Sequence, residues 1–381
     1  MSLTIEQQIT TALHKSAKPL IVFKRHFSGD ALSAAIALRL LLQKLNKPAD
    51  IACDGFVLPE GYKFLPAKEM IQNKLETLRQ MIISIPVDKT DVEQFHYDVT
   101  DSELKIFLSP KKGFFGPQDV RATASPWKYD LIITLDTPDL ESLGGLYADN
   151  REFFYERPII NIDCSPANEQ YGQMNLIDLT SSSTCGVLYN LIKAWDEKLF
   201  DPDINTCLLA GIIDKTRSFK AGMINPQTLT MSSDLISRAA RREEIVKHLY
   251  YNKDIKTLKL WGRVLGRLSE HYNGKLVIAQ VTPADFAETG TAPANLPEII
   301  DELISSVPSV EVAVLLYQAA AGPAQVMMKS LGAFNPLRAL SRLQPTGDKN
   351  LVKIQLPDAD LATAEHTLLE EIKKSYRPEF S

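Results

Sequence analysis

The 381-residue sequence lacks the features that mark secreted, membrane-spanning and zinc-binding proteins. It has four cysteines, and they show neither the CxxC spacing of a zinc module nor a disulfide framework. They are Cys53, Cys164, Cys185 and Cys207. No apolar run approaches the roughly 18–20 residues that a membrane span needs, and the first residues lack the layout of a signal peptide. We therefore expect a soluble, cytoplasmic protein that does not enter a membrane.

An excess of basic residues is also missing. The 42 lysines and arginines stand against 47 aspartates and glutamates, which gives a formal net charge of −5. The charge of the whole chain therefore provides no electrostatic case for nucleic-acid binding, although a local basic patch stays compatible with it. A hydrophobic content of 45% with 23% charged residues is typical of a folded protein. The length is sufficient for two or three domains.

Apolar segments that end on polar residues and alternate with helical patterns predict a buried parallel sheet in residues 1–220. An amphipathic helix is expected at the N-terminus, and a second helix is expected at 31–45, where apolar side chains recur at helical spacing. The expected strands cover residues 19–23, 50–53, 130–135, 159–162 and 207–213. Ligands of such sheets bind beyond the carboxyl ends of the strands. Polar residues at these ends are therefore the candidates for function.

A β-rich insertion is expected at about residues 75–126, between the second and third of these strands. Within it, residues 81–87, 94–99 and 103–108 alternate or cluster as strands do. The segment 111–116 (KKGFFG) is basic and aromatic. Both an ordinary solvated turn and a contact with a partner or with nucleic acid stay open for it.

The remaining chain predicts a helical connector at 221–269 and a smaller α/β domain at 270–381. The connector contains expected helices at 228–240, 243–250 and 255–269. The last domain contains expected strands at 276–281, 311–317 and 325–331 and expected helices at 297–306 and 361–374.

Four segments near the expected strand ends carry the candidates for chemistry. They read KRHFSGDA at 24–31, DLIITLDTPDLESLG at 130–144, IINIDCSPANEQYGQMN at 159–175 and GIIDKTRSF at 211–219. These segments resemble the four motifs of the DHH phosphoesterases. In that family four aspartates and two histidines hold two Mn²⁺ ions, because two hard cations close together need several carboxylates. The resemblance implies metal-dependent hydrolysis of phosphoesters.

This sequence departs from the family pattern at most of the ligand positions. Asp30 and Asp136 occupy two of the six, and in the family the carboxylate at the position of Asp136 bridges the metals. Asp163 keeps the aspartate of the Asp-His-His triplet. Other residue types stand at the remaining four ligand positions: Lys24 for histidine, Ser28 for aspartate, Cys164 for the metal-binding histidine of the triplet, and Lys215 for aspartate. Ser165 replaces the second histidine of the triplet, which faces the phosphate in the family. Lys24 and Lys215 thus bring ammonium groups to places where the family binds a cation.

Two interpretations of these positions need no cofactor. In the first, the two lysines pair with Asp30 and Asp136 and keep the fold intact without a ligand. In the second, a pocket binds a phosphate or nucleotide without hydrolysing it. The pocket would consist of Lys24, Arg25, Lys215, Arg217, Ser183, Thr184 and Lys329. The segment 181–186 (SSSTCG) matches the helix start of the family, and its hydroxyls can cap the helix and leave backbone N–H groups free towards the strand ends.

A third interpretation retains Mn²⁺ and catalysis. Asp30 and Asp136 would be the metal ligands, and further ligands would come from Asp163, His26, Cys164 and Asp214. Two lysines at ligand positions oppose this interpretation, because their charges repel divalent cations.

The second half of the chain carries a further resemblance. Residues 248–268 (HLYYNKDIKTLKLWGRVLGRL) resemble the helical connector of the RecJ-like subfamily, which includes nanoRNases and pAp phosphatases. The C-terminal part resembles that subfamily's DHHA1 domain, which presses an Arg-Ser pair and a glycine-histidine loop onto the substrate. Here Lys329 stands for the arginine, and 344–348 (QPTGD) stands for the loop. Pro345 and Asp348 cannot reproduce a flexible loop that approaches phosphate closely.

These observations predict an α/β protein with a parallel-sheet DHH domain, a β-rich insertion, a helical connector and a smaller α/β DHHA1 domain. We expect a pseudo-phosphoesterase that binds a phosphorylated ligand, such as a nucleotide or a short single-stranded nucleic acid, or a protein partner through the insertion. The alternative is a divergent Mn²⁺-dependent phosphoesterase that acts on short oligonucleotides or pAp-like nucleotides. A purely structural subunit and a homodimer also stay open at this point.

Overall fold

A computed structural model describes residues 3–66, 71–88, 91–219, 224–251, 254–307, 309–319, 322–331, 334–347, 350–356 and 360–375. The chain divides into two compact units, residues 1–252 and 253–381. Each unit has its own six-stranded sheet and its own hydrophobic core. The helices expected as a connector at 221–269 are divided between the units. Among the described residues, no helix is both long enough and apolar enough to cross a membrane.

The sheet of the first unit is parallel and has the strand order β10-β9-β8-β1-β2-β3. Its strands are β1 (Pro19–Phe23), β2 (Asp50–Ala52), β3 (Ile71–Gln72), β8 (Leu131–Leu135), β9 (Ile159–Asp163) and β10 (Met174–Ile177). From β1 the chain builds the sheet outwards through β2 and β3, and it then returns to the other side of β1 with β8. The order therefore reverses between β1 and β8, and side chains that follow these two strands share the crevice at the switch point.

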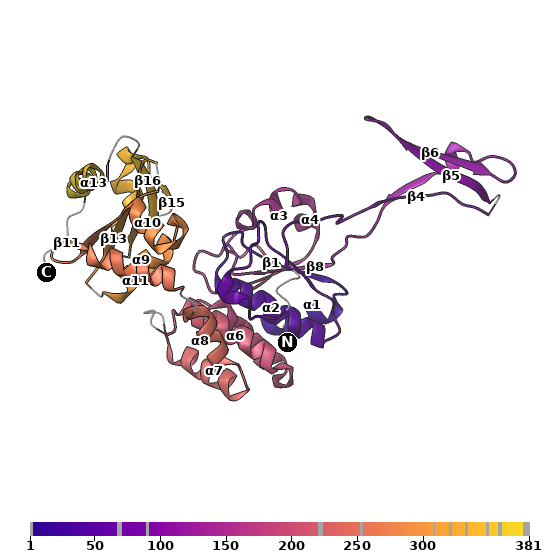
Figure 1. Ribbon diagram of the computed structural model, residues 1–381. Coiled ribbons are helices and arrows are strands. Elements are labelled where there is room, and N and C mark those ends of the chain that lie inside the picture. Colours follow the sequence, from indigo (N-terminus) through magenta and orange to yellow (C-terminus); the bar gives the residue numbers. More distant parts are fainter. Residues whose placement is uncertain are drawn as a thin grey trace. The chain divides into compact units, whose positions relative to one another are not determined.

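Helices cover both faces of this sheet (Figure 1). The helices of the first unit are α1 (Ile5–Lys15), α2 (Gly29–Lys44), α3 (Gly145–Ala148), α4 (Arg151–Glu156), α5 (Thr184–Trp195), α6 (Pro202–Lys215), α7 (Pro226–Ser237) and α8 (Arg242–Tyr250). Side chains of β1 alternate between the faces, so that Ile21 packs in the core of α1, α2, α5 and α6, whereas Val22 packs in the core of α3 and α4. Burial on both faces explains why these strands read as continuous apolar runs.

The strand expected at 207–213 is wrong, because these residues belong to helix α6. A short apolar run does not distinguish a buried strand from a buried helix. The flanking residues carry the missed signal: Asp201 caps α6 by accepting hydrogen bonds from two backbone N–H groups, and Pro202 is its first residue. Gly211 explains the close packing of α6, since a β-carbon there would lie 2.3 Å from Cys185 Sγ and 2.9 Å from a carboxylate oxygen of Asp30.

The expected insertion is present as four strands that pair only with one another. They are β4 (Met81–Ser84), β5 (Val92–Val99), β6 (Leu104–Pro110) and β7 (Arg121–Ala124). β4 pairs with β7 and β5 pairs with β6, both antiparallel. We call residues 81–124, apart from 89 and 90, the β arm. β7 was not expected from the sequence, because RATA is only four residues long and its apolar positions are alanines, which have low strand propensity.

The second unit combines parallel and antiparallel pairing in the strand order β11-β12-β13-β14-β16-β15. The strands are β11 (Ser269–His271), β12 (Leu276–Val281), β13 (Val312–Gln318), β14 (Ala324–Ser330), β15 (Thr346–Gly347) and β16 (Leu351–Leu356). The helices are α9 (Ile255–Gly266), α10 (Pro283–Thr289), α11 (Leu296–Ser306), α12 (Pro336–Ala339) and α13 (Leu361–Ser375). The expected α/β class is thus confirmed for both parts of the chain.

One buried carboxylate links α9 to α10. Asp285, which is 1% exposed, accepts hydrogen bonds from the N–H of Thr282 (2.8 Å) and its hydroxyl (2.7 Å), and it pairs with Arg263 (2.9 Å) and with Arg267. Burial alone would raise the pKa of the Asp285 carboxyl, but the bonds from Thr282, Arg263 and Arg267 outweigh it and hold the pKa well below its usual value.

We expect Asp285→Asn to lower the free energy of unfolding of the second unit by about 2–4 kcal/mol, because the amide cannot satisfy two guanidinium groups and the helix cap together. Since the folded-state pKa is depressed, this contribution is complete above the ordinary pKa of an aspartate and is lost as the pH falls below it. Urea unfolding at neutral and acidic pH measures both effects. Glu288→Gln is the control, since Glu288 is exposed and also pairs with Arg263; an equal loss in both variants would contradict the prediction.

Candidate functional site

The switch point between β1 and β8 holds the charged residues singled out from the sequence. Lys24 directly follows β1, Asp136 directly follows β8, and Asp163 ends β9. Asp136 has a φ of +47°, a left-handed conformation that L-residues other than asparagine and aspartate rarely adopt. Its side chain is 3% exposed. The strand ends therefore hold a carboxylate that is almost removed from solvent.

Two lysines from different elements pair with this carboxylate. Lys24 Nζ lies 2.9 Å from one Asp136 oxygen, and Lys215 Nζ, from the last residue of α6, lies 3.5 Å from the other. The hydroxyl of Ser28 donates to Asp136 at 2.7 Å and also accepts from the N–H of Ala31, which caps α2. Asp136 thus connects the ends of β1 and α6 and the start of α2.

Asp30 is fully buried and has a different role from the one expected. Its two carboxylate oxygens accept hydrogen bonds from the N–H groups of Thr184 (2.7 Å) and Cys185 (2.9 Å) at the start of α5. The expectation of free N–H groups at this helix start is therefore wrong for these two, because a carboxylate from α2 occupies them. Burial and the charge of Asp136 raise the pKa of the Asp30 carboxyl to about 6, against the opposing effect of Lys215.

Asp163 shapes the loop that follows β9. It accepts hydrogen bonds from the backbone N–H groups of Cys164 (2.7 Å) and Ser165 (3.1 Å) and from the side-chain amide of Asn168 (2.8 Å). Cys164 Sγ lies 3.8 Å from the hydroxyl of Thr184. Burial, together with the charge of nearby Asp30, raises the pKa of the Cys164 thiol to about 12. The thiol is therefore neutral at physiological pH.

A fourth carboxylate, Asp214, faces into the same region from α6. One of its oxygens would lie 2.7 Å from a β-carbon placed on Gly29, and the hydroxyl of Tyr62 is also in contact with Gly29. Burial raises the pKa of Asp214, and the positive charge of Lys215 opposes the shift. We call Asp30, Asp136, Asp163 and Asp214 together with Lys24 and Lys215 the strand-end cluster. No motif in the sequence pointed to Tyr62, whereas Asn168 could have been suspected as an asparagine in the loop after a strand.

Arg25, Arg217 and Lys329 were also expected in an anion pocket. Arg25 is exposed and pairs with Asp54 at 3.6 Å. Arg217 is exposed and follows the end of α6 with a φ of +47°. Lys329 belongs to the second unit, where it pairs with Asp301.

Residues 181–184 serve mainly the start of α5. The hydroxyl of Ser183 accepts from the N–H of Gly186 at 3.0 Å, and the hydroxyl of Ser182 shares a hydrogen bond of 2.7 Å with Thr228. His26, considered as a metal ligand, is exposed. Asp348, considered in the loop of the second unit, lies outside the described residues.

The donor set does not fit two divalent cations. Lys24 and Lys215 place ammonium groups on both oxygens of Asp136, where a bridging carboxylate would have to face the metals. Asp30 directs both of its oxygens to backbone N–H groups. Within the described ranges, no three histidine, cysteine, aspartate or glutamate side chains are grouped so that they could hold a metal ion. The arrangement instead balances buried carboxylates with ammonium groups and N–H donors.

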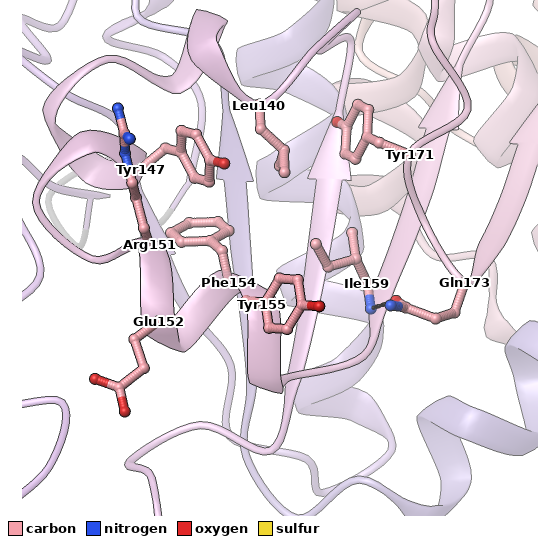
Figure 2. Close-up of a pocket in the computed structure, with 9 residues that line it drawn as sticks. All are labelled: Leu140, Tyr147, Arg151, Glu152, Phe154, Tyr155, Ile159, Tyr171 and Gln173. Atoms are coloured by element: carbon pink, nitrogen blue, oxygen red, sulfur yellow. Dashed lines mark hydrogen bonds between the residues drawn. The ribbon is translucent and has the colours of Figure 1, made fainter.

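A cavity of about 740 Å³ lies beside α4 and contains none of these residues (Figure 2). It is lined by Leu140, Tyr147, Arg151, Glu152, Phe154, Tyr155, Ile159, Tyr171 and Gln173. Tyr171 donates from its hydroxyl to Thr134 at 2.8 Å, and Arg151 lies over the ring of Tyr147 at 5.8 Å. The lining is mainly aromatic and aliphatic, so sequence reasoning based on charged motifs did not reach it.

Comparisons with known proteins find relatives that match part of the chain. No family model matches the chain. The bifunctional oligoribonuclease and PAP phosphatase NrnA of Thermus thermophilus is 24% identical to it over 219 residues, which are 57% of this chain and 64% of the relative. The protein of the same name from Bacillus subtilis is 25% identical over 170 residues, 44% of this chain and 52% of the relative. The chain thus spans less than two thirds of the length of either relative.

A solved structure extends the likeness of the fold to nearly the whole chain. The crystal structure of an exopolyphosphatase-related protein from Bacteroides fragilis matches with a TM-score of 0.70 over 97% of this chain and 96% of that protein. The sequence identity is 15%. This similarity shows a shared architecture of sheet, helices and second domain.

We expect the double variant Lys24→Met, Lys215→Met to lose about 3–5 kcal/mol of unfolding free energy, because it leaves the Asp136 carboxylate buried without either ammonium group. Adding Asp136→Asn should recover most of this loss, since the amide carries no charge to desolvate. Urea unfolding of the three variants measures the effect. A triple variant no more stable than the double variant would show that the lysines do not stabilise the fold through Asp136.

The raised pKa of Asp30 predicts a pH dependence of a definite sign. Between the ordinary aspartate pKa of about 4 and about 6, the folded chain binds the proton more tightly than the unfolded chain does, so stability falls as the pH rises through this window. The difference in unfolding free energy between the wild type and Asp30→Asn should therefore shrink by on the order of 3 kcal/mol from pH 4 to pH 7. A difference that stays constant over this range would contradict the prediction.

Proposed function

Because the chain belongs to the DHH/DHHA1 phosphoesterase family, we propose that it is a family member that acts by binding and does not hydrolyse phosphoesters. One observation carries this proposal. Lys24 and Lys215 hold Asp136, the carboxylate that the resemblance assigns to bridging the two metals, at 2.9 and 3.5 Å. The position of the catalytic cations is taken by the chain's own cations.

Electrostatics supports this proposal. A divalent cation beside Asp136 would lie within a few ångströms of both ammonium groups, and the repulsion from each is on the order of several kcal/mol at the effective dielectric of a protein site. Moving the lysines away would leave their charges partly buried, since the side chains of Lys24 and Lys215 are 25% and 29% exposed. Metal binding is therefore disfavoured whether the two lysines stay in place or move away.

The charges of the strand-end cluster bear on whether the chain binds a phosphorylated ligand or a protein partner. A phosphorylated ligand is supported by the partly exposed ammonium groups of Lys24 and Lys215, with Arg25 and Arg217 nearby in the sequence. It is opposed by Asp30, which occupies the helix N–H groups that would otherwise bind an anion. We therefore favour a protein partner, and we place a nucleotide or short single-stranded nucleic acid second.

A divergent Mn²⁺-dependent phosphoesterase is the second candidate function. It is supported by the four carboxylates of the strand-end cluster, including Asp214, which faces inwards although it is displaced by one position from the family motif. The names of the relatives make short oligoribonucleotides and pAp-like nucleotides the natural substrates to test. In this candidate, Asp30, Asp136, Asp163 and Asp214 would have to release their present partners before they could bind metal.

The deciding experiment combines calorimetry of Mn²⁺ binding with assays of pAp and short oligoribonucleotide hydrolysis. We expect neither heat of binding nor turnover for the wild-type chain, because the ammonium groups exclude the cation. Tight Mn²⁺ binding with turnover that is lost in Asp136→Asn would overturn the proposal and establish the phosphoesterase.

A back-substituted variant provides the positive control. Lys24→His, Ser28→Asp, Cys164→His and Lys215→Asp together restore the family residue at every substituted position among the six ligand positions. We expect this variant to bind Mn²⁺, since it replaces two repelling charges by ligands. Arg25→Gln, outside the cluster, is the matched control and should leave the calorimetric result unchanged. Circular dichroism verifies that each variant is folded.

A further inference from the structure

The hairpin of β5 and β6 in the β arm has one face that is apolar throughout. The pairing places Phe95 opposite Leu108, Tyr97 opposite Ile106 and Val99 opposite Leu104. Side chains directly opposite each other in an antiparallel pair lie on the same face, and alternate residues of a strand share a face. These six side chains therefore form one surface, which we call the hairpin face.

The hairpin face is accessible to solvent. Five of its side chains are between 39% and 65% exposed, and Leu108 is half-buried. The rings of Phe95 and Tyr97 lie 6.5 Å apart at its centre. A two-stranded sheet alone is at best marginally stable in water, and contiguous apolar surface of this kind marks interaction sites in soluble proteins.

The opposite face of the same hairpin has a different character. There His96 stacks on Phe107 with ring centroids 4.6 Å apart, and Asp98 lies opposite Lys105. A polar outer face and an apolar inner face are the pattern of a sheet that packs against a second layer. The described part of the arm supplies no second layer on the hairpin face, since five of the six side chains stay exposed there.

We propose that the hairpin face binds the same face of a second copy of this chain, so that two arms form a two-layered β-sandwich about a twofold axis. The hairpin face carries no charged residue, so its own copy can approach without repulsion between like charges. Its six side chains, two of them aromatic, offer on the order of 500 Å² of apolar surface. Two copies would bury about 1,000 Å², the area at which specific interfaces begin.

The base of the arm lies at the end of the sheet opposite the strand-end cluster. The arm rejoins the first unit just before β8, where Lys128 N–H donates to Leu78 at 2.8 Å and Trp127 donates to Glu156 at 2.7 Å. Asp136 follows the other end of β8. Association through the arm therefore leaves the cluster unchanged, and the proposed dimer does not depend on whether the cluster hydrolyses a phosphoester.

Two neighbouring substitutions on β6 test the proposal. Ile106→Glu places a charge at the centre of the hairpin face, and Phe107→Glu places the same charge on the opposite face. The two side chains are 39% and 43% exposed, so neither substitution removes a core residue. Sedimentation equilibrium and light scattering over a range of protein concentrations measure the self-association of the full chain.

We expect a dimeric wild type, a Phe107→Glu variant that dimerises like it, and an Ile106→Glu variant whose dimerisation is at least about a hundredfold weaker, because dimerisation would bury an unpaired charge. A wild type that is monomeric at every concentration overturns the proposal. A dimer that persists in Ile106→Glu, or one that both variants weaken equally, overturns it as well, because association would then not use the hairpin face. Far-UV circular dichroism checks that both variants keep the strand content of the wild type.

Discussion

The pairing of Asp136 with Lys24 and Lys215 is the interaction on which the centre of the first unit depends. Asp136 is held in a left-handed conformation at the switch point of the sheet, and it is nearly removed from solvent. A carboxylate in that position has a large desolvation cost unless cations accompany it. One ammonium group comes from the end of β1 and the other from the end of α6. The sheet and α6 are thus joined by ion pairs at the switch point.

A second buried carboxylate, Asp30, is stabilised by hydrogen bonds from backbone N–H groups. Asp30 satisfies the N–H groups of Thr184 and Cys185, so the start of α5 is saturated from inside the protein. Gly211 permits this arrangement, because a side chain at position 211 of α6 would collide with Asp30 and Cys185. Asp30 and Asp136 therefore both have partners from within the chain.

Much of this fold could be predicted from the sequence, but fewer of the contacts within the strand-end cluster could. The strands at 19–23 and 159–163 could be predicted because a strand buried on both faces is a continuous apolar run. The same rule failed at 207–213, where the run belongs to a helix buried on all sides. The lysines at ligand positions were visible in the sequence. Strand order explains why Lys24 meets Asp136, whereas Lys215 reaches it from the end of α6. The contact of Asp30 with α5 joins residues more than a hundred positions apart, and no local pattern encodes such a contact.

The insertion of the β arm between β3 and β8 also bears on how the chain folds. The central pairing of the first sheet joins Pro19 of β1 to Leu131 of β8, so it must close a long loop before any of its hydrogen bonds form. The arm lies within that loop, and its β5–β6 hairpin needs only neighbouring residues. Local hairpins form much faster than distant strands meet. An early hairpin would shorten the disordered part of the loop, so the arm can act as a folding spacer for the sheet from which it emerges.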